Sequence, residues 1–477
     1  RPGRGRSVGM KLTTDDRRAV PHRDAFDGAD GARWKATGVS TDSRSVGAGD
    51  IFVALRGERY DGHNFVSTAV EQGAAAIVVE ARWASSNGQM MARLHVPRVV
   101  VDDSVLALGT LARTVRRQFD IPVIAVGGSN GKTTTKEMIR AVLARRHTVL
   151  ATEGTLNNHI GVPQPLFRLE KKHDVAVIEV GTNHPGEIAH LCSVAEPTHG
   201  LLTNIGREHL EHFGSVEGVA RAEGELWEWL AANRGTAFVN GDDARITRST
   251  RSLKKKVVYG FRARSANVKG SRLTSDDEGR ATLTVRKGSN PAFRLHVAVP
   301  GLHNGANALA AAAVGLSFGV PPTQIAVAVS GLTAANKRMQ VVHMNGVTVL
   351  NDTYNANPDS VLAALATLRA FTVTGRRIAV LGDMFELGAA AEESHRLVGR
   401  AVRREGIDLL LATGPLSQEM VRASGMTSAE HHPDKQTLVR RLQAILRPGD
   451  VVLVKGSRGM QMEDVVSGIT SSTPKAA

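Results

Sequence analysis

A glycine-rich segment with one lysine and two threonines is the part of this sequence best suited to chemistry. It reads Gly-Gly-Ser-Asn-Gly-Lys-Thr-Thr over residues 127–134. Glycines let backbone N–H groups wrap around a phosphate, and a helix that starts directly afterwards adds a favourable partial positive charge. Lys132 would reach the β- and γ-phosphates of ATP, and the Thr133 hydroxyl would bind Mg²⁺. The alternative is a glycine-rich turn that carries an exposed lysine.

The sequence on either side of this loop decides between the two interpretations. The apolar run Ile121–Val126 predicts a buried parallel strand before the loop, and Thr133–Arg146 predicts a helix after it. A strand–loop–helix context is what gives a Gly-Lys-Thr motif its meaning. The strict motif also requires a glycine five positions before Gly131, where this chain has Val126. We therefore interpret the loop as a shortened nucleotide-binding variant that begins at Gly128.

The order of predicted strands and helices indicates an α/β protein with three domains. With 477 residues, the chain is too long for one hydrophobic core. Strands that alternate with helices around the loop predict a central, doubly wound P-loop domain. Four strands beyond a candidate hinge at Leu332–Lys337 predict a smaller, Rossmann-like α/β domain. The predicted boundaries are 1–9 for a disordered extension, 10–118 for an N-terminal α/β domain, 119–333 for the central domain and 334–477 for the C-terminal domain.

The individual strands are predicted from short apolar runs of Val, Ile, Leu and Ala, which are typical of buried strands. In the first two domains these runs occupy residues 51–55, 75–79, 121–126, 175–180 and 200–204. Residues 257–259, 281–285 and 293–299 predict an antiparallel appendage to the central domain. Residues 348–350, 377–381, 409–411 and 450–454 predict the C-terminal sheet.

Composition and charge limit the kinds of partner. The formal net charge is +14, yet the basic residues are spread along the chain, and Lys254–Lys256 forms the one tight run. A diffuse positive charge suits phosphate-bearing substrates, so we expect no nucleic-acid partner. The single cysteine, Cys192, permits no disulfide within the chain and is typical of the cytoplasm. No apolar run approaches the roughly 18–20 residues of a membrane span, and we expect a monomer.

The loop and six later segments together resemble the Mur ligase family. Residues 126–135 are similar to the ATP loop of that family, and the other segments follow in the family's order. They are residues 154–163, 178–188, 203–215, 301–310, 351–360 and 453–458. The resemblance extends from about Val39 to Met462, nearly the whole chain. It implies an ATP-dependent ligase that activates a carboxylate as an acyl phosphate and forms an amide bond, releasing ADP and phosphate.

Two groups of residues bear on the branch of the family. Ser40–Arg44 and Asp61–Phe65 resemble segments shared with the ligase that adds the third peptide residue. Tyr354–Pro358, Gly382–Gly388 and His395 resemble the branch that adds D-alanyl-D-alanine. The resemblance therefore implies that UDP-N-acetylmuramoyl-tripeptide and D-alanyl-D-alanine are joined during synthesis of peptidoglycan precursors. It also implies that the N-terminal domain binds the uridine nucleotide.

The resemblance assigns residues to ATP and to Mg²⁺. The implied ATP contacts are Gly128, Ser129, Asn130, Gly131, Lys132, Thr133, Thr134, Asn304, Asn307, Arg338 and Asp352. Helix capping by Asn304 and a surface ion pair of Arg338 are the alternatives. The implied metal ligands are Thr133, Glu179, His209 and Glu223, and the implied catalytic residues are Lys132, Glu179, His209 and Glu223. Structural roles for Glu179 and His209 are the alternatives, and Mg²⁺ prefers oxygen to a histidine nitrogen.

The resemblance also assigns contacts to the two substrates. At the uridine-diphosphate end and along the sugar and peptide it implies Asp42, Ser43, Arg44, His63, Asn157 and Asn158. For D-alanyl-D-alanine and the distal end of the tripeptide it implies Asn355, Asn357, Asp383, Lys455, Ser457 and Arg458. The alternatives are a turn with a surface arginine at Arg44, a plain loop at Asn157 and Asn158, and a simple turn at Ser457.

One position departs from the family. Relatives commonly carry a lysine after the histidine segment, and its amine takes up CO₂ to become a carbamate ligand for a second Mg²⁺. Here residues 220–225 read Ala-Arg-Ala-Glu-Gly-Glu, so Glu223 stands at that position. Its carboxyl carbon is about 3–4 Å closer to the backbone than a carbamate carbon. Either the backbone lies nearer the metal or a water bridges the gap; the alternative is a surface helix residue and a lost or rebuilt metal site.

Other functions stay open at this point. Folylpolyglutamate synthetase has a similar loop and similar chemistry but lacks an N-terminal uridine-nucleotide domain, whereas about 80 residues precede the loop domain here. The ligase that adds the third peptide residue shares the N-terminal segments. A non-catalytic regulator would bind ATP without turnover. A nucleic-acid ATPase would carry an aromatic stacking series, which the sequence lacks.

Overall fold

The computed structural model of the chain describes residues 12–13, 35–57 and 60–471, so the predicted extension 1–9 lies outside it. By internal packing the chain divides into two compact units. The first comprises the described residues up to Ala125, His147–Gly181 and Glu187–His199, and the second comprises Val126–Arg146, Thr182–Gly186 and the residues from Gly200 onward. None of the helices in these ranges is long and apolar enough to cross a membrane.

A four-stranded parallel sheet forms the N-terminal part of the first unit. Its order is β3 (Gly38–Ser40), β4 (Asp50–Val53), β5 (Ala76–Glu80) and β6 (Arg98–Val101). An antiparallel pair, β1 (Leu12–Thr13) and β2 (Lys35–Ala36), precedes it. Its core includes residues from α1 (Val66–Glu71) and α3 (Gly88–Arg93), and partly buried residues of α2 (Ala81–Ser86) pack against it. The strands predicted at 51–55 and 75–79 are confirmed, displaced by one or two residues.

Helix α4 (Ser104–Arg116) connects this sheet to β7 (Val123–Gly127), the strand before the glycine-rich loop. The guanidinium of Arg116, at the end of the helix, is buried. It donates to the backbone oxygens of Ala195, Phe119 and Ile121, at 3.2, 2.6 and 3.0 Å. A buried cation is unfavourable unless it is hydrogen-bonded, so these three bonds stabilise the path of the chain into β7.

The loop of residues 128–131 follows β7 within a nine-stranded sheet of order β15-β14-β13-β12-β11-β10-β7-β9-β8. The strands on the β7 side are β8 (Val149–Ala151), β9 (Val175–Glu179) and β10 (His199–Leu202). Helix α5 (Lys132–Leu143) starts directly after the loop, as predicted. The other helices around this sheet are α6 (Pro163–Leu166), α7 (Glu187–Ala195), α8 (Leu210–Phe213), α9 (Val216–Ala232), α11 (His303–Ser317) and α12 (Pro322–Ser330).

The far end of this sheet differs from the prediction. Residues 257–259 belong to β12 (Lys256–Gly260), which pairs in parallel with β11 (Thr236–Asn240) and with β13 (Val268–Ser275). The antiparallel part consists of β13, β14 (Arg280–Lys287) and β15 (Phe293–Pro300). The reason is the helix α10 (Ala244–Ser249) between β11 and β12, because a crossover helix returns the chain to the starting edge and makes the next strand parallel.

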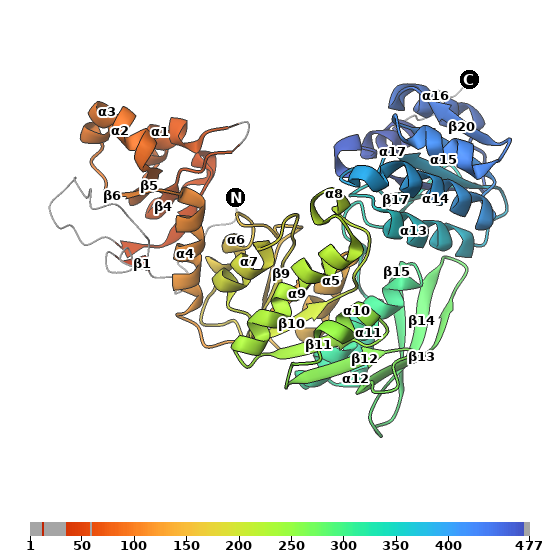
Figure 1. Ribbon diagram of the computed structural model, residues 1–477, viewed down its shortest axis with the longest axis horizontal. Helices are drawn as coiled ribbons and strands as arrows, with labels where there is room; N and C mark the ends of the chain where they lie inside the picture. The colour runs from red at the N-terminus through yellow and green to blue at the C-terminus, as the bar shows by residue number, and fades with distance from the viewer. Residues whose placement is uncertain (1–11, 14–34, 58–59, 472–477) are drawn as a thin grey trace. The chain divides into compact units, whose positions relative to one another are not determined.

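The C-terminal part of the second unit is a six-stranded sheet with helices on both faces (Figure 1). Its order is β16-β17-β21-β18-β19-β20. The four predicted strands are β17 (Val347–Asp352), β18 (Arg377–Gly382), β19 (Leu409–Thr413) and β21 (Val451–Lys455). The prediction missed β16 (Gln340–Met344) and β20 (Ala429–His432), because these edge strands are half exposed and lack a continuous apolar run.

Two separate hydrophobic clusters cover the faces of this sheet. One includes residues of α13 (Pro358–Ala370), α14 (Ala391–Arg404) and α15 (Ser417–Ser424), and the other includes residues of α16 (Lys435–Ile445) and α17 (Glu463–Thr470). Because β17, β21 and β18 are parallel, their carboxyl ends lie at one edge, where ligands bind in open α/β sheets. Asp352 and Lys455 are partners in register at this edge.

Arg116→Met should lower the stability of the first unit, because it leaves buried backbone oxygens without their donor. Losing the partner of a buried polar group costs about 1–3 kcal/mol. We expect a clear fall in the midpoint of urea denaturation, followed by circular dichroism. The control is Arg113→Met on the same helix, where the side chain is only half buried. An unchanged midpoint for Arg116→Met would show that water replaces the guanidinium without loss.

Candidate active site

Two glycines give the loop between β7 and α5 its shape. Gly128 and Gly131 have φ angles of +102° and +84°. A Cβ atom on Gly128 would lie 2.5 Å from the hydroxyl oxygen of Thr203, and one on Gly131 would lie 2.9 Å from the amide oxygen of Asn307. These approaches are too close for real atoms, and a side chain disfavours the left-handed backbone. The geometry of the loop therefore requires glycine at both positions.

The segment after β10 holds the loop in this shape. The Ser129 N–H donates to the backbone oxygen of Asn204 at 2.8 Å, and the Asn130 N–H donates to Asn204 Oδ1 at 3.2 Å. The Ser129 hydroxyl accepts the N–H of Gly206 at 2.8 Å. Because Ser129 and Asn130 use their N–H groups in this way, the predicted phosphate contact rests on the N–H groups at the start of α5. Asn204 and Gly206 were not predicted as site residues.

The ammonium group of Lys132 lies back over its own loop. Its Nζ donates to the backbone oxygens of Gly128 and Ser129. It also forms an ion pair with Glu208, in which Nζ and Oε2 are 3.3 Å apart. The side chains of Lys132 and Glu208 are 16% and 7% exposed, so water screens their attraction weakly. A phosphate that binds the ammonium group of Lys132 must therefore compete with these backbone oxygens and with the Glu208 carboxylate.

Glu223 reaches the same loop from α9. Its side chain is fully buried, and its Oε2 accepts the N–H of Gly128 at 2.9 Å. Burial raises the pKa of Glu223 to about 7; the nearby Lys132 lowers this pKa, the charge of Glu208 raises it further, and the Gly128 hydrogen bond lowers it. The alternative of a surface helix residue is therefore wrong, because this carboxylate touches the loop directly.

Two carboxylate oxygens beside the loop are open to a cation. Glu208 Oε1 and Glu223 Oε1 are buried, and neither accepts a hydrogen bond from the described part of the chain. Mg²⁺ is commonly held by one or two carboxylates and completed by phosphate oxygens and water. Residues 12–13, 35–57 and 60–471 contain no group of three or more His, Cys, Asp or Glu side chains placed around one metal position. The residues thus fit a Mg²⁺ ion that arrives with a phosphate.

Hydrogen bonds hold the carboxylate of Glu179 in place within the first unit. Glu179 ends β9 and is 1% exposed. Its Oε1 accepts from the amide of Asn157 at 2.9 Å, and its own N–H donates to the Thr152 hydroxyl at 3.0 Å. Asn157 therefore orients the predicted metal ligand. Asn158 instead accepts the N–H groups two and three residues further on, which closes a turn and matches the plain-loop alternative.

His209 faces a carboxylate from the C-terminal part of the chain. Its Nδ1 is paired with Glu386, and this hydrogen bond lowers the pKa of Glu386. The backbone of His209 is left-handed, with φ +46°, which costs a non-glycine residue about 1–2 kcal/mol. A proton on Nδ1 leaves the lone pair on Nε2, as in histidines that bind metals. The pairing is therefore compatible with the predicted ligand role.

The two asparagines predicted to contact adenosine adjoin the loop. Asn304 and Asn307 are both buried near the start of α11. The Asn304 amide donates to the Pro300 backbone oxygen at 2.7 Å, and the Asn307 amide donates to Asn304 Oδ1 at 2.9 Å. Asn304 lies inside the helix, so the capping alternative is wrong. Because Asn307 packs against Gly131, these amides link α11 to the loop.

Predicted residues of the C-terminal domain meet at the carboxyl edge of β17 and β21. Lys455 Nζ lies 2.5 Å from Asp352 Oδ2 and donates to the backbone oxygen of Asn355 at 2.9 Å. Asn355 Oδ1 accepts the N–H of Arg458 at 3.2 Å. These contacts bring four residues, each predicted to bind ATP or a substrate, into one hydrogen-bonded group.

Two arginines share one aromatic ring beside this group. The guanidinium carbons of Arg338 and Arg458 lie 3.9 and 5.7 Å from the centre of the Tyr354 ring. The ring face attracts both cations, which gathers positive charge beside the predicted substrate contacts. The described structure has this stacking in place of the surface ion pair that was the alternative for Arg338.

Asp383 stabilises the carboxyl ends of β18 and β21 through hydrogen bonds. Its carboxylate is 2% exposed and accepts the N–H groups of Ser417 and Leu416 at 2.7 and 3.2 Å. Its backbone oxygen accepts the N–H of Ser457 at 3.0 Å, and the Ser457 hydroxyl accepts the N–H of Phe385 at 2.8 Å. Asp383 and Ser457 therefore tie together the ends of β18 and β21.

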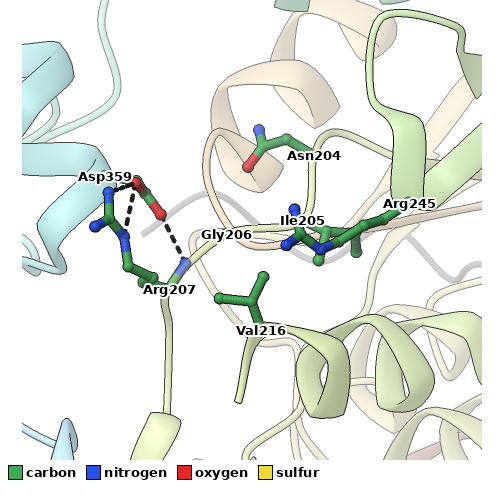
Figure 2. Close-up of a pocket in the computed structure, with 7 residues that line it drawn as sticks. All are labelled: Asn204, Ile205, Gly206, Arg207, Val216, Arg245 and Asp359. Carbon is green, nitrogen blue, oxygen red and sulfur yellow. Dashed lines mark hydrogen bonds and ion pairs between the residues drawn. The ribbon is translucent and has the colours of Figure 1, made fainter. Parts of the chain in front are cut away.

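A pocket of about 470 Å³ adjoins the loop within the second unit (Figure 2). It is lined by Asn204, Ile205, Gly206, Arg207, Val216, Arg245 and Asp359. Arg207 donates to the Asp359 carboxylate through its backbone N–H at 2.7 Å and its Nε at 3.1 Å. Nearby, the Asn357 amide donates to the side-chain oxygen of Asn130 at 2.9 Å. Sequence reasoning missed the lining residues, although most lie in the segments 203–215 and 351–360 that carried the resemblance.

The residues predicted for the uridine-diphosphate end lie in the first unit. Asp42 caps a short 3-10 turn, and its carboxylate binds the backbone N–H and guanidinium of Arg44. This side-chain hydrogen bond lowers the pKa of Asp42 to about 2. The Arg44 side chain is 88% exposed, so the guanidinium is accessible to a phosphate, and Ser43 is buried within the turn.

His63 uses both ring nitrogens within the first unit. Its Nδ1 lies 2.6 Å from Asp61 Oδ1, and its Nε2 accepts the N–H of Glu80 at 2.9 Å. The ring is buried and lies 5.3 Å from the ring of Trp83. A nucleotide contact through a ring nitrogen therefore requires the exchange of a protein partner.

Acid should destabilise the C-terminal domain through His395. Burial lowers the pKa of His395 from its ordinary 6.5, although the Ala391 oxygen that its Nδ1 contacts raises this pKa. In the folded domain the Nε2 of His395 accepts the Met384 N–H at 3.1 Å, which requires a ring nitrogen without a proton. A lowered pKa means that this stability is present above pH 6.5 and is lost as the pH falls below it. His395→Gln should therefore show a smaller fall in melting temperature than wild type between about pH 7.5 and about pH 5.5. Equal falls would count against the assignment.

Comparisons with known families agree with this geometry. The Mur ligase middle domain matches residues 126–315, the glutamate ligase domain of Mur ligases matches 337–458, and the catalytic domain of the Mur ligase family matches 35–116. The first of these contains the loop with Lys132 and Glu223. The second contains the group around Asp352 and Lys455.

Relatives with known names match along most of the chain. The UDP-N-acetylmuramoyl-tripeptide–D-alanyl-D-alanine ligase of Escherichia coli is 38% identical over 442 residues, which cover 92% of this chain and 95% of the relative. The ligase of the same name from Bacillus subtilis is 34% identical and covers 91% of this chain and 93% of the relative.

Solved structures share the fold. MurF from Acinetobacter baumannii has a TM-score of 0.85 at 30% identity, covering 97% of this chain and 99% of its own. The MurF ligase of Thermotoga maritima, solved in complex with ADP, has a TM-score of 0.79 at 27% identity, covering 91% and 97%. The predicted α/β fold is thus confirmed, and the chain belongs to the Mur ligase family.

Proposed function

We propose that this Mur ligase joins D-alanyl-D-alanine to UDP-N-acetylmuramoyl-tripeptide while ATP is converted to ADP and phosphate. The observation that carries the proposal is the glycine loop, with Lys132 and the buried carboxylate of Glu223 beside it. Relatives of that name, similar over about nine-tenths of the chain, support the choice of substrates. The ADP bound to the Thermotoga maritima enzyme supports the nucleotide. The reaction would supply a precursor of peptidoglycan.

The chemistry requires two anions to meet. The terminal carboxylate of the tripeptide attacks the γ-phosphate of ATP, the bond to ADP breaks, and an acyl phosphate forms. The deprotonated amine of D-alanyl-D-alanine then attacks the acyl carbon, and phosphate leaves. Lys132 and the N–H groups at the start of α5 stabilise the phosphate charge, because fixed donors need little reorganisation as charge develops. Lys132 must first turn away from the oxygens of its own loop.

Mg²⁺ bound at this site supplies charge neutralisation for the phosphate oxygens. As the resemblance implies, we assign Thr133 and Glu179 to a first Mg²⁺, and His209 and Glu223 to a second. Support comes from the buried carboxylates of Glu179 and Glu223, each oriented by a hydrogen bond, and from the Glu223 oxygen that stays open. Glu223 already touches the loop, so its role requires no CO₂.

The remaining predicted residues divide between nucleotide and substrates. Asn304 and Asn307 are proposed for adenosine, and Arg338 and Asp352 for the ribose and phosphates. Asp42, Ser43, Arg44, His63, Asn157 and Asn158 are proposed for the UDP-linked substrate, and Asn355, Asn357, Asp383, Lys455, Ser457 and Arg458 for the dipeptide and the end of the tripeptide. The hydrogen bonds that join Asp352, Lys455, Asn355 and Arg458 support a common binding edge.

We also place the reaction in the cytoplasm, with Mg²⁺ and ATP supplied there. Cys192 is the single cysteine of the chain and is buried, which is compatible with a reducing compartment. The monomeric state and the absence of a nucleic-acid partner stay predictions.

Phosphate release should require every substrate. We expect steady release with ATP, Mg²⁺, UDP-N-acetylmuramoyl-tripeptide and D-alanyl-D-alanine together, and little release when either acceptor substrate is omitted. The assay is a coupled measurement of free phosphate, with the amide product identified by mass spectrometry. Replacing the tripeptide substrate by folylglutamate, or the dipeptide by single amino acids, tests the neighbouring ligase activities. Release with nucleic acid alone, or ATP binding without any turnover, would contradict the proposal.

Glu223→Ala should lower the rate and weaken the dependence on Mg²⁺, because it removes the carboxylate that touches Gly128. Loss of one preorganised charged group typically costs about 10²–10³ in rate. Glu223→Lys offers a sharper comparison, since a lysine there could form a carbamate. Its activity should rise when bicarbonate is added, whereas wild-type activity should not change. Wild-type kinetics for Glu223→Ala at limiting Mg²⁺ would show that this carboxylate does not serve the metal.

A further inference from the structure

Glu208 lies beside the loop but is not among the residues proposed to contact ATP, Mg²⁺ or the substrates. This residue precedes His209, and its side chain is 7% exposed. Its Oε2 lies 3.3 Å from Nζ of Lys132, the group that must bind phosphate. Its Oε1 is buried and accepts no hydrogen bond from residues that the structure describes. A buried carboxylate with an open oxygen is unfavourable unless a cation or another donor completes it.

Glu208 and Glu223 flank the same loop. Glu208 Oε2 lies 3.3 Å from Lys132 Nζ, which donates to the Gly128 oxygen, and Glu223 Oε2 accepts the Gly128 N–H at 2.9 Å. Lys132 interacts with both, by an ion pair with Glu208 and through its charge with Glu223. Both carboxylates thus act on one ammonium group. A nucleotide phosphate would add negative charge beside the Glu208 carboxylate, which is already paired with that ammonium group.

We propose that the Glu208 carboxylate is the partner of Lys132 when no nucleotide is bound, and that it passes to a divalent cation when ATP binds. The inference rests on the proposed ATP site. The phosphates of ATP replace Glu208 as the partner of Lys132. The Glu208 carboxylate then binds the cation together with Glu223. The Glu208 side chain thus holds Lys132 over the loop before the nucleotide binds, and it contacts the cation afterwards.

This exchange makes nucleotide affinity depend on the cation. Without a divalent cation, the charge of Glu208 competes with phosphate for Lys132 and repels it. With a cation present, the same charge becomes attractive. Glu208 therefore makes the loop select the nucleotide–metal complex over the bare nucleotide.

The test measures binding of N-methylanthraniloyl-ADP to the full-length chain by fluorescence, once with EDTA and once with Mg²⁺. The readout is the ratio of the two dissociation constants, Kd in EDTA over Kd in Mg²⁺. Glu208→Gln keeps the shape of the side chain and removes its charge. We expect this ratio to fall about tenfold, mainly through tighter binding in EDTA, because a like charge a few Å from the phosphates is gone.

Two further variants control this experiment. Glu211→Gln makes the same change of charge at an exposed position of the same segment, so its ratio should match wild type. Glu208→Asp keeps the charge and should stay close to wild type. Because Glu208→Asp changes the shape and Glu208→Gln the charge, a difference between them separates electrostatics from folding. Thermal melts of all variants confirm that each chain is folded.

The outcomes separate this inference from the proposed function. A wild-type ratio for Glu208→Gln would overturn the role of Glu208 and leave the ATP site intact. An equal fall in Glu208→Gln and Glu211→Gln would overturn it as well, since the effect would then come from net charge alone. A wild-type chain that binds no nucleotide in either buffer would overturn the proposed function itself.

Discussion

The proposed reaction brings the negative charges of ATP and of a carboxylate to one loop, and that loop carries a single lysine. The contacts around the loop in the second unit are best understood from this electrostatic constraint. Lys132 is bound by oxygens of the loop itself and by Glu208. The glycines at 128 and 131 let the backbone turn tightly enough to place N–H groups there. Glu223 adds a second buried carboxylate. Internal hydrogen bonds and an ion pair thus hold Lys132 over the loop, and the proposed phosphate has to replace them.

The C-terminal domain contributes to the loop through side chains that are remote in sequence. Asn357 donates to Asn130, a pair 227 positions apart. Asp359 binds Arg207 across 152 positions, and Glu386 is paired with His209. Each of these contacts involves either the loop or the segment after β10 that is hydrogen-bonded to it. The segments that follow β17 and β18 are therefore in contact with the loop and with the segment after β10.

Local patterns predicted those parts of the fold and site that depend on local constraints. Buried strands show as apolar runs, and the loop shows as glycines and a lysine at fixed spacing, so β7, α5 and Lys132 could be predicted. Edge strands such as β16 and β20 carry no such run, and the parallel pairing of β12 depends on a crossover. The pairing of Arg207 with Asp359 depends on tertiary packing, which no local pattern encodes. The resemblance to the Mur ligase family identified candidate site residues, but it could not predict whether the side chain of Glu223 is buried.

The departure from the family at Glu223 is placed beside the loop by its hydrogen bond to Gly128. A glutamate is shorter than a carbamylated lysine, so the sequence left two possibilities, a nearer backbone or a bridging water. Oε2 of Glu223 lies 2.9 Å from the Gly128 nitrogen, so α9 brings this side chain into direct contact with the loop. Glu208 brings a second carboxylate to the same place from the segment after β10. The proposed metal role of Glu223 therefore requires no CO₂, because an unmodified carboxylate already offers an oxygen beside the loop.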